Sequence, residues 1–167
     1  TSDLRFHRYF CHYFAMRAVI ALGANIENPQ ENIDLAIALL REATDIQAIS
    51  SMFRTAPVGG PEQPDYINAV ALAESDLPAT DFLKMLHGIE KALGRERTVR
   101  WGPRTIDLDL IQYGSILSSS EELLLPHPRA HERRFVLEPW LEIDPDAHLL
   151  THGRVEHLLS ALLESEQ

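Results

Sequence analysis

The sequence predicts an α+β domain in which one antiparallel sheet packs against helices. Three observations lead to this class: apolar runs of strand length alternate with amphipathic stretches of helix length, their order is β-α-β-β-α-β, and a helical tail comes last. This is the order of the ferredoxin-like arrangement, whose helices lie on one face of the sheet. We therefore expect the other face to be free to carry a site, and the tail to form a C-terminal helical extension.

The first two elements are a buried strand and an amphipathic helix. Residues 17–25 form a short apolar run that Gly23 closes. Asn28 is a suitable cap for the next helix, with Pro29 at its first position. Apolar residues then recur at i, i+4 and i+7, which gives this helix a single stripe to bury.

The middle of the chain predicts two further strands and a second helix. Residues 46–55 and 66–74 have strand character and flank a loop, 56–65, with three prolines and two glycines. Residues 78–93 carry an apolar helical face, and Gly94 is suited to end that helix.

The last sheet strand and the tail complete the pattern. Alternation from Thr105 onward predicts a fourth strand, and a polar loop occupies residues 125–134. A short helix near 135–142 and a final amphipathic helix that carries apolar residues from Val155 to Leu163 make up the tail.

Composition limits the kinds of partner that the protein can have. The chain has 167 residues with 45% hydrophobic and 24% charged residues, which suits one soluble domain with a real core. A formal charge of −10 argues against nucleic acid or an anionic membrane as partner. The single cysteine, Cys11, excludes an internal disulfide and fits the cytoplasm. We therefore expect small-molecule substrates.

The N-terminal segment, residues 1–15, has a different composition from the remainder of the chain. It is aromatic and basic, and every apolar stretch in it is interrupted by Arg or His, so it makes a poor signal peptide. The regular pattern begins at Met16. We interpret residues 1–15 as an extension or a cloning remnant and 16–167 as one domain; the alternative is an ordered N-terminal arm.

Two carboxylates on the fourth strand are the first candidate site. Asp107 and Asp109 are two residues apart, so their side chains point to the same side, about 6.6 Å apart along the strand. Such hard oxygen ligands suit Mg²⁺, which completes its shell with water and phosphate oxygens. The alternative is an exposed polar strand face.

Basic residues cluster just before these carboxylates. Five of the fifteen Lys and Arg residues fall between 91 and 104, and guanidinium groups match phosphate oxygens. The chain has only two lysines, so arginine is also its usual base. A Walker-type glycine-rich motif is absent from the sequence. Together with the carboxylates, the cluster predicts a site for a magnesium–polyphosphate that is not a P-loop.

Tyr66 and Asn68 share one face of the third strand in the same way. An aromatic ring beside an amide can stack on a flat heterocycle and hydrogen-bond its edge. Sheet packing around a satisfied asparagine is the alternative for this pair.

Three segments resemble one enzyme family. They are FRTAPVGGPEQPDYINAV, RWGPRTIDLDL and LPHPRAHERRFVL, and the chain from about Met16 to its C-terminus is similar to 6-hydroxymethyl-7,8-dihydropterin pyrophosphokinases (HPPK). The resemblance implies a ferredoxin-like fold and a monomer that binds ATP with two Mg²⁺ ions. It also implies transfer of the β,γ-diphosphate of ATP to the pterin hydroxymethyl group, with release of AMP.

The resemblance also implies residue roles. Asp107 and Asp109 would be the metal ligands, and Asp109 would also help to remove the hydroxyl proton. Catalytic arginines of a closing loop would be Arg95 and Arg97, the latter in a segment one residue shorter than in familiar bacterial members. The implied ATP contacts are Glu90, Arg104, Ile111, His127 and Arg133. The implied pterin pocket comprises Thr55, Val58, Tyr66, Asn68, Trp101 and Phe135.

Two departures and two rival functions are also part of the prediction. Some members have proline where Ala56 stands and tyrosine where Pro128 stands, which bears on loop stiffness and on one ATP contact. A metal-dependent nucleotidyltransferase would release pyrophosphate instead of AMP. A small regulatory ligand-binding module would show no turnover.

Overall fold

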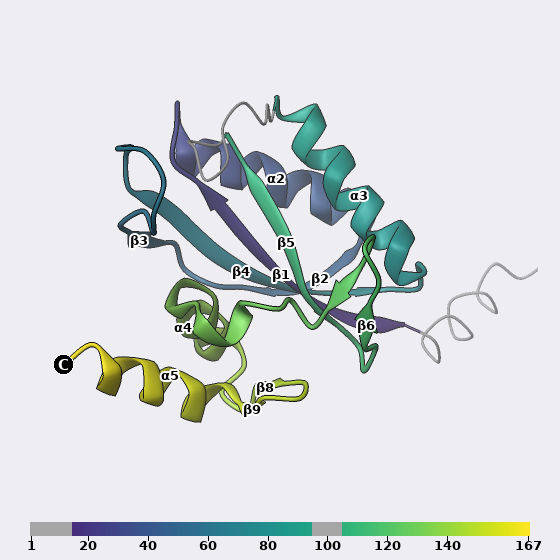
Figure 1. Ribbon diagram of the computed structural model, residues 1–167. Coiled ribbons are helices and arrows are strands. Elements are labelled where there is room, and N and C mark those ends of the chain that lie inside the picture. The colour runs from purple at the N-terminus through teal and green to yellow at the C-terminus, as the bar shows by residue number, and fades with distance from the viewer. Residues whose placement is uncertain (1–14, 95–104) are drawn as a thin grey trace, which may run out of the picture.

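A computed structural model describes residues 15–94 and 105–167 of the chain. In the described part, one antiparallel sheet lies between two layers of helices, with α2 and α3 on one face and α4 and α5 on the other (Figure 1). The sheet has the order β2-β4-β1-β5, and β3 pairs with a second stretch of β4. Its strands are β1 (Met16–Ala24), β2 (Asp45–Ile49), β3 (Phe53–Thr55), β4 (Tyr66–Ser75) and β5 (Asp107–Tyr113).

The strand register brings the two predicted polar pairs into line. Gly23 of β1 lies opposite Asn68 of β4 on one side and opposite Asp107 of β5 on the other. Asn68 in turn lies opposite Phe53 of β3. Because directly opposite residues point to the same side of an antiparallel sheet, Asp107 and Asn68 share one face across the glycine.

Helices α2 (Pro29–Ala43) and α3 (Ala79–Ala92) cover the opposite face of the sheet. Both form as predicted, and Gly94 follows α3 with φ of 78°, a left-handed conformation that glycine adopts without strain. The predicted cap of α2 is wrong in one respect: the Asn28 side chain makes no capping hydrogen bond, although Pro29 does begin the helix.

The sheet face that carries Asp107, Gly23 and Asn68 is only half open. Helices α4 (Arg134–Ile143) and α5 (Val155–Ser165) pack over the first part of β1 and the middle of β4. Buried Val136, Leu137 and Trp140 of α4 fill this second core, at about 1.5 to 3 kcal/mol for each large apolar side chain. Our expectation of a free face therefore holds only at the end of the sheet that bears Gly23.

The predicted strand 46–55 is two strands. At Ser50 the hydroxyl accepts a hydrogen bond from the N–H of Val70 at 2.9 Å, which takes a place in the ladder that a main-chain carbonyl would fill. Ser51 then turns away, because its N–H and its hydroxyl both donate to the carboxylate of Glu142 on α4, each at 2.7 Å. Pairing resumes at Phe53 with a shifted stretch of β4.

Short elements that the pattern did not predict complete the chain. They are two small hairpins, β6 (Ser118–Ser119) with β7 (Leu124–Leu125) and β8 (His148–Leu149) with β9 (Gly153–Arg154), and the 3-10 turn η2 (Ala130–Glu132). Among the helices of the described residues, none is both long and apolar enough to span a bilayer.

Candidate functional site

A cleft of about 1110 Å³ opens at the uncovered end of the sheet. Its floor is the C-terminal end of β1 with its neighbours, and its walls are the loop 56–65 on one side and the segment 127–138 on the other. Nine of the predicted site residues line it: Thr55, Val58, Tyr66, Asn68, Asp107, Asp109, His127, Arg133 and Phe135. Segments more than 80 residues apart in the sequence thus meet in one cavity.

The two carboxylates lie at the edge of this floor. Asp107 is opposite Gly23 and Asp109 is opposite Ala21, so small residues leave space beside both acids. Arg133 donates from its Nη1 to Oδ2 of Asp109 at 3.5 Å, in a pair whose side chains are 17% and 32% exposed. An arginine therefore approaches the carboxylates from the wall formed by residues 127–138.

The donor set at this edge fits magnesium better than zinc. In the described residues, groups of three or more His, Cys, Asp or Glu side chains that could enclose a metal are absent. Two neighbouring carboxylates facing an open cleft are enough for Mg²⁺, which keeps several water ligands and takes others from substrate phosphates. The residues present therefore fit the metal that the sequence predicts.

His127 lies in the same wall as Arg133, and its imidazole is neutral. Burial, and then the charge of Arg133, lower the pKa of His127 to about 4, while Asp107 acts in the opposite direction. Its Nδ1 accepts a hydrogen bond from the N–H of Arg129 at 3.2 Å. A neutral ring that accepts at Nδ1 carries its proton on Nε2, which leaves Nε2–H as a donor.

The other half of the cleft has a different chemistry. Asn68 is 5% exposed and donates from Nδ2 to Oγ1 of Thr55 at 2.5 Å. Its Oδ1 lies over Gly23, so close that an added Cβ there would be 3.1 Å away. The amide is thus held in one orientation on the floor of the sheet, and the glycine is what makes room for it.

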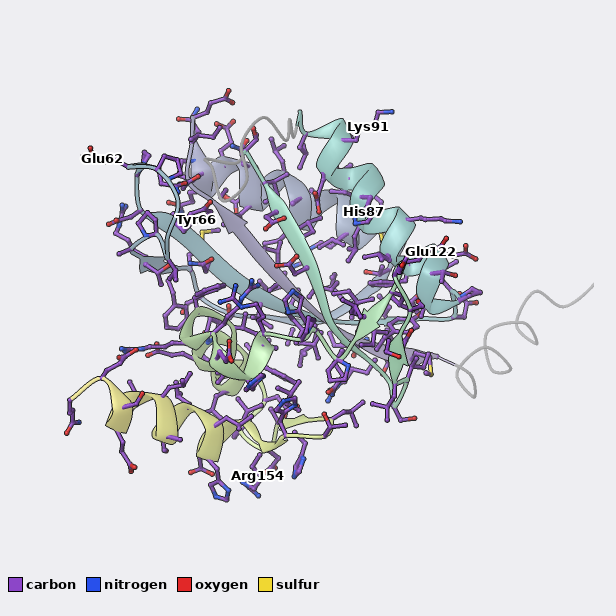
Figure 2. The ribbon with its side chains drawn as sticks, in the orientation of Figure 1. Glu62, Tyr66, His87, Lys91, Glu122 and Arg154 are labelled. Atoms are coloured by element: carbon purple, nitrogen blue, oxygen red, sulfur yellow. The ribbon has the colours of Figure 1, made fainter. Side chains whose placement is uncertain are left out.

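Aromatic rings from both walls line this half. Phe135, in the first turn of α4, lies under the guanidinium of Arg133, with 5.5 Å between the guanidinium carbon and the ring centroid. Tyr66 begins β4 at the base of the loop whose outer tip carries Glu62, as Figure 2 shows. An amide edge and aromatic faces suit a planar heterocycle.

Two residues that were predicted to contact ATP do not line the cleft. Glu90 is 3% exposed on α3, on the far side of β5, and its Oε1 accepts from the N–H of Leu108 at 3.2 Å. Ile111 is fully buried in the core under α4, and its carbonyl accepts from the N–H of His127 at 2.8 Å. Neither residue lines the cleft, and their contact with ATP remains a prediction.

Four further predicted residues lie outside the described residues: Arg95, Arg97, Trp101 and Arg104. Conversely, the cleft contains side chains that the sequence patterns did not single out. These are Phe53, Arg54, Gln63, Arg129, Glu132, Arg134, Glu138 and Glu166. All but Glu138 and Glu166 lie within the segments that resemble the family, so their place in those motifs was a signal; the position of Glu138 and Glu166 is revealed only by the folded chain.

The fold and the cleft define the class first: this is an α+β domain with groups suited to a metal–phosphate at one end of its cleft and groups suited to a flat ring at the other. The sequence profile of the 7,8-dihydro-6-hydroxymethylpterin-pyrophosphokinase (HPPK) family matches residues 19–145. The chain belongs to this family.

Similar proteins agree with that assignment. A Haemophilus influenzae 2-amino-4-hydroxy-6-hydroxymethyldihydropteridine pyrophosphokinase is 40% identical over 131 residues, 77% of this chain and 82% of the relative. The Bacillus subtilis enzyme of the same name is 41% identical over 128 residues, 75% of this chain and 77% of the relative.

A solved structure shows the fold at a larger evolutionary distance. The crystal structure of wild-type Plasmodium falciparum HPPK-DHPS matches with a TM-score of 0.71 at 12% identity and covers 90% of this chain. The match spans 45% of that longer chain.

Proposed function

We propose that this chain transfers the β,γ-diphosphate of ATP to the hydroxymethyl group of 6-hydroxymethyl-7,8-dihydropterin in a magnesium-dependent reaction. The products are the pterin diphosphate and AMP, and the reaction belongs to folate biosynthesis. The observation that carries the proposal is the row Asp107–Gly23–Asn68, which sets a carboxylate and an oriented amide on one floor, with only a glycine between them.

The polyphosphate end of the cleft is the end of Asp107 and Asp109. Asp107 and Asp109 would hold two Mg²⁺ ions there, and the metal would supply charge neutralisation for the phosphates. Arg133 and the Nε2–H of His127 face the same space from the wall formed by residues 127–138 and would donate to phosphate oxygens. Arg133 donates to Asp109 and His127 accepts from the N–H of Arg129, and these contacts lower the entropic cost of orienting ATP.

In the transfer step, the pterin hydroxyl oxygen forms a bond to the β-phosphorus while the bond from that phosphorus to the oxygen of the α-phosphate breaks. AMP leaves with that oxygen, and the hydroxyl proton departs toward Asp109. The chain supplies no covalent intermediate: its contribution is alignment and charge compensation. Arg95 and Arg97 would add positive charge around the transferred group, and Arg104 and Glu90 would assist ATP binding.

The acceptor ring occupies the aromatic end. Asn68 hydrogen-bonds the amide-like edge of the pterin, Phe135 stacks on its face, and Tyr66, Thr55, Val58 and Trp101 complete the pocket. The support for this is the polar and aromatic lining of that end of the cleft, together with the fixed orientation of the Asn68 amide.

The architecture extends the proposal. We propose a ferredoxin-like fold with α4 and α5 as its C-terminal helical extension, and the sheet order β2-β4-β1-β5, with β2 and β3 as one interrupted strand, supports this proposal. We assign residues 16–167 to one domain that acts as a cytoplasmic monomer.

Product analysis tests the proposal. The protein is mixed with 6-hydroxymethyl-7,8-dihydropterin and MgATP, with and without EDTA, and products are identified by mass spectrometry. AMP and the pterin diphosphate in equal amounts, both abolished by EDTA, are the expected result. ADP, free pyrophosphate or unchanged ATP would contradict it.

A matched pair of variants locates the reaction. Asp107→Ala removes a cleft carboxylate, whereas Asp146→Ala removes an exposed one that pairs with Arg154 outside the cleft. Loss of product in the first and full product in the second are expected. Equal activity in the two variants would remove the cleft from the mechanism.

A further inference from the structure

The loop 56–65 needs anchors from outside itself. Three of its ten residues are prolines, which lack an N–H, and Gly59 and Gly60 adopt left-handed conformations with φ of 73° and 77°, so the loop has no regular main-chain ladder of its own. It nevertheless forms one wall of the cleft and carries Val58, which is 74% exposed there. Contacts from outside the loop must hold this wall in place if the acceptor is to bind in a preformed pocket.

Asn25 supplies that anchor from the end of β1. The side chain is 2% exposed, and its Nδ2 donates to Oε1 of Gln63 and to the carbonyl of Pro64, both at 2.9 Å. A buried amide that donates two bonds into one loop is costly to leave unsatisfied, by about 1 to 3 kcal/mol. The loop is therefore tied to a central strand of the sheet.

Gln63 connects this anchor to the acceptor end of the cleft. Its Oε1 also accepts from the hydroxyl of Tyr66 at 3.4 Å, and its Nε2 donates to the carbonyl of Pro61 at 3.4 Å. One side chain thus joins the buried end of β1, the loop and the ring of Tyr66. Tyr66 lies opposite Thr55, whose hydroxyl accepts from Asn68, so the contacts reach the floor of the acceptor end.

We propose that Gln63 is a positioning residue for the acceptor: together with Asn25 it holds the loop 56–65 and the Tyr66 ring in the orientation that receives the pterin. The role rests on the proposed function for the identity of the acceptor. It acts through Tyr66 and the loop, at the opposite end of the cleft from Asp107 and Asp109, so it sets acceptor affinity and leaves ATP affinity unchanged.

The test compares three variants by steady-state kinetics with each substrate varied in turn. Gln63→Leu keeps the size and removes both hydrogen-bonding groups, and should raise KM for the pterin about tenfold, with KM for ATP within about twofold of wild type. Gln63→Glu retains an acceptor for Asn25 and Tyr66 and should stay near wild type. Gln47→Leu, at an exposed β2 position outside the cleft, is the control and should change neither constant.

A second substitution separates positioning from general destabilisation. Once Gln63 is leucine, Asn25→Ala should raise KM for the pterin by less than it does in the wild-type background, because the two residues act as one unit. Unchanged pterin KM in Gln63→Leu would overturn the proposal. Equal rises in both KM values with a lowered melting temperature would also overturn it.

Hydrogen exchange keeps this test independent of the reaction. In Gln63→Leu, but not in Gln47→Leu, amides of residues 58–66 should exchange faster, and unchanged exchange there would contradict the positioning role. If wild type forms no AMP from any pterin, the proposed function fails while the exchange result still decides whether Gln63 fixes the loop.

Discussion

The carboxylate of Glu90 accepts a hydrogen bond from the backbone N–H of Leu108, at 3.2 Å, and Leu108 is the residue between Asp107 and Asp109. In the described part of the chain β5 is an edge strand of the sheet, so its outward N–H groups meet no neighbouring strand there. Glu90, buried on α3, takes that place at the one residue that separates the two acids. A helix on the far face of the sheet thereby steadies the strand that bears the carboxylates.

Substitution of Glu90 should therefore affect the reaction through that strand. In Glu90→Leu the Leu108 N–H loses this partner, and we expect a loss of about 1 to 3 kcal/mol in stability together with a tenfold or larger fall in kcat. Glu90→Gln keeps an oxygen acceptor and should recover most of both. Urea unfolding and kinetics at varied Mg²⁺ measure this, with exposed Glu42→Leu as control; equal kcat in all three variants would contradict it.

The two carboxylates should be unequal in their effect on ATP. Asp107→Ala and Asp109→Ala should each lower kcat by several orders of magnitude with the fold retained. Asp109→Ala also removes the ion pair with Arg133, so it should change KM for ATP more than Asp107→Ala does. MgATP should raise the melting temperature of wild type by mass action and of neither variant. Circular dichroism confirms folding, and wild-type turnover in either variant would remove the metal assignment.

Gly23 should be intolerant of the smallest side chain. A Cβ at this position would lie 3.1 Å from Oδ1 of Asn68, and Asn68 is itself bonded to Thr55. Gly23→Ala should push the amide off its orientation and raise KM for the pterin about tenfold, at a stability cost of about 1 to 3 kcal/mol. Gly88→Ala, where an added Cβ meets nothing within 4 Å, is the control. An unchanged pterin KM would show that Asn68 adapts.

A pH dependence of stability is expected from Glu142. The hydrogen bonds from Ser51 lower the pKa of Glu142 from its ordinary 4.5. Because the folded-state pKa lies below that of the unfolded chain, the stabilisation is present above pH 4.5 and is lost as the pH falls through the folded value. Glu142→Gln should thus melt about 2 °C below wild type at pH 7, a small effect because the carboxylate is exposed.

At low pH the two proteins should converge. Melting curves of wild type and Glu142→Gln from pH 7 to pH 3 measure this difference directly. A gap that stays constant with pH would mean that the tie between Ser51 and α4 does not depend on the carboxylate charge.

Local pattern predicted most elements, because each of the long strands and helices is amphipathic or buried along its own length. It could not predict that 46–55 breaks into two strands. That break depends on Ser50 bonding to β4 and on Ser51 bonding to α4, which are contacts between distant segments. The short hairpins β6–β7 and β8–β9 were not predicted for a related reason, because two-residue strands are too short to show a periodic pattern in the sequence.

The candidate site divides in the same way. The sequence alone determined which groups are candidates for the site, since D-x-D on a strand and the motif resemblance name Asp107, Asp109, Asn68 and Phe135. Only the tertiary structure decided where those groups meet. Register placed Asp107 and Asn68 on either side of Gly23, and α4 and α5 closed half of the face we had expected to be free. The hydrogen bond between Asn25 and Gln63 and the indirect place of Glu90 also emerged only from the fold, because a hydrogen bond between residues 18 to 38 positions apart leaves no periodic pattern along the chain.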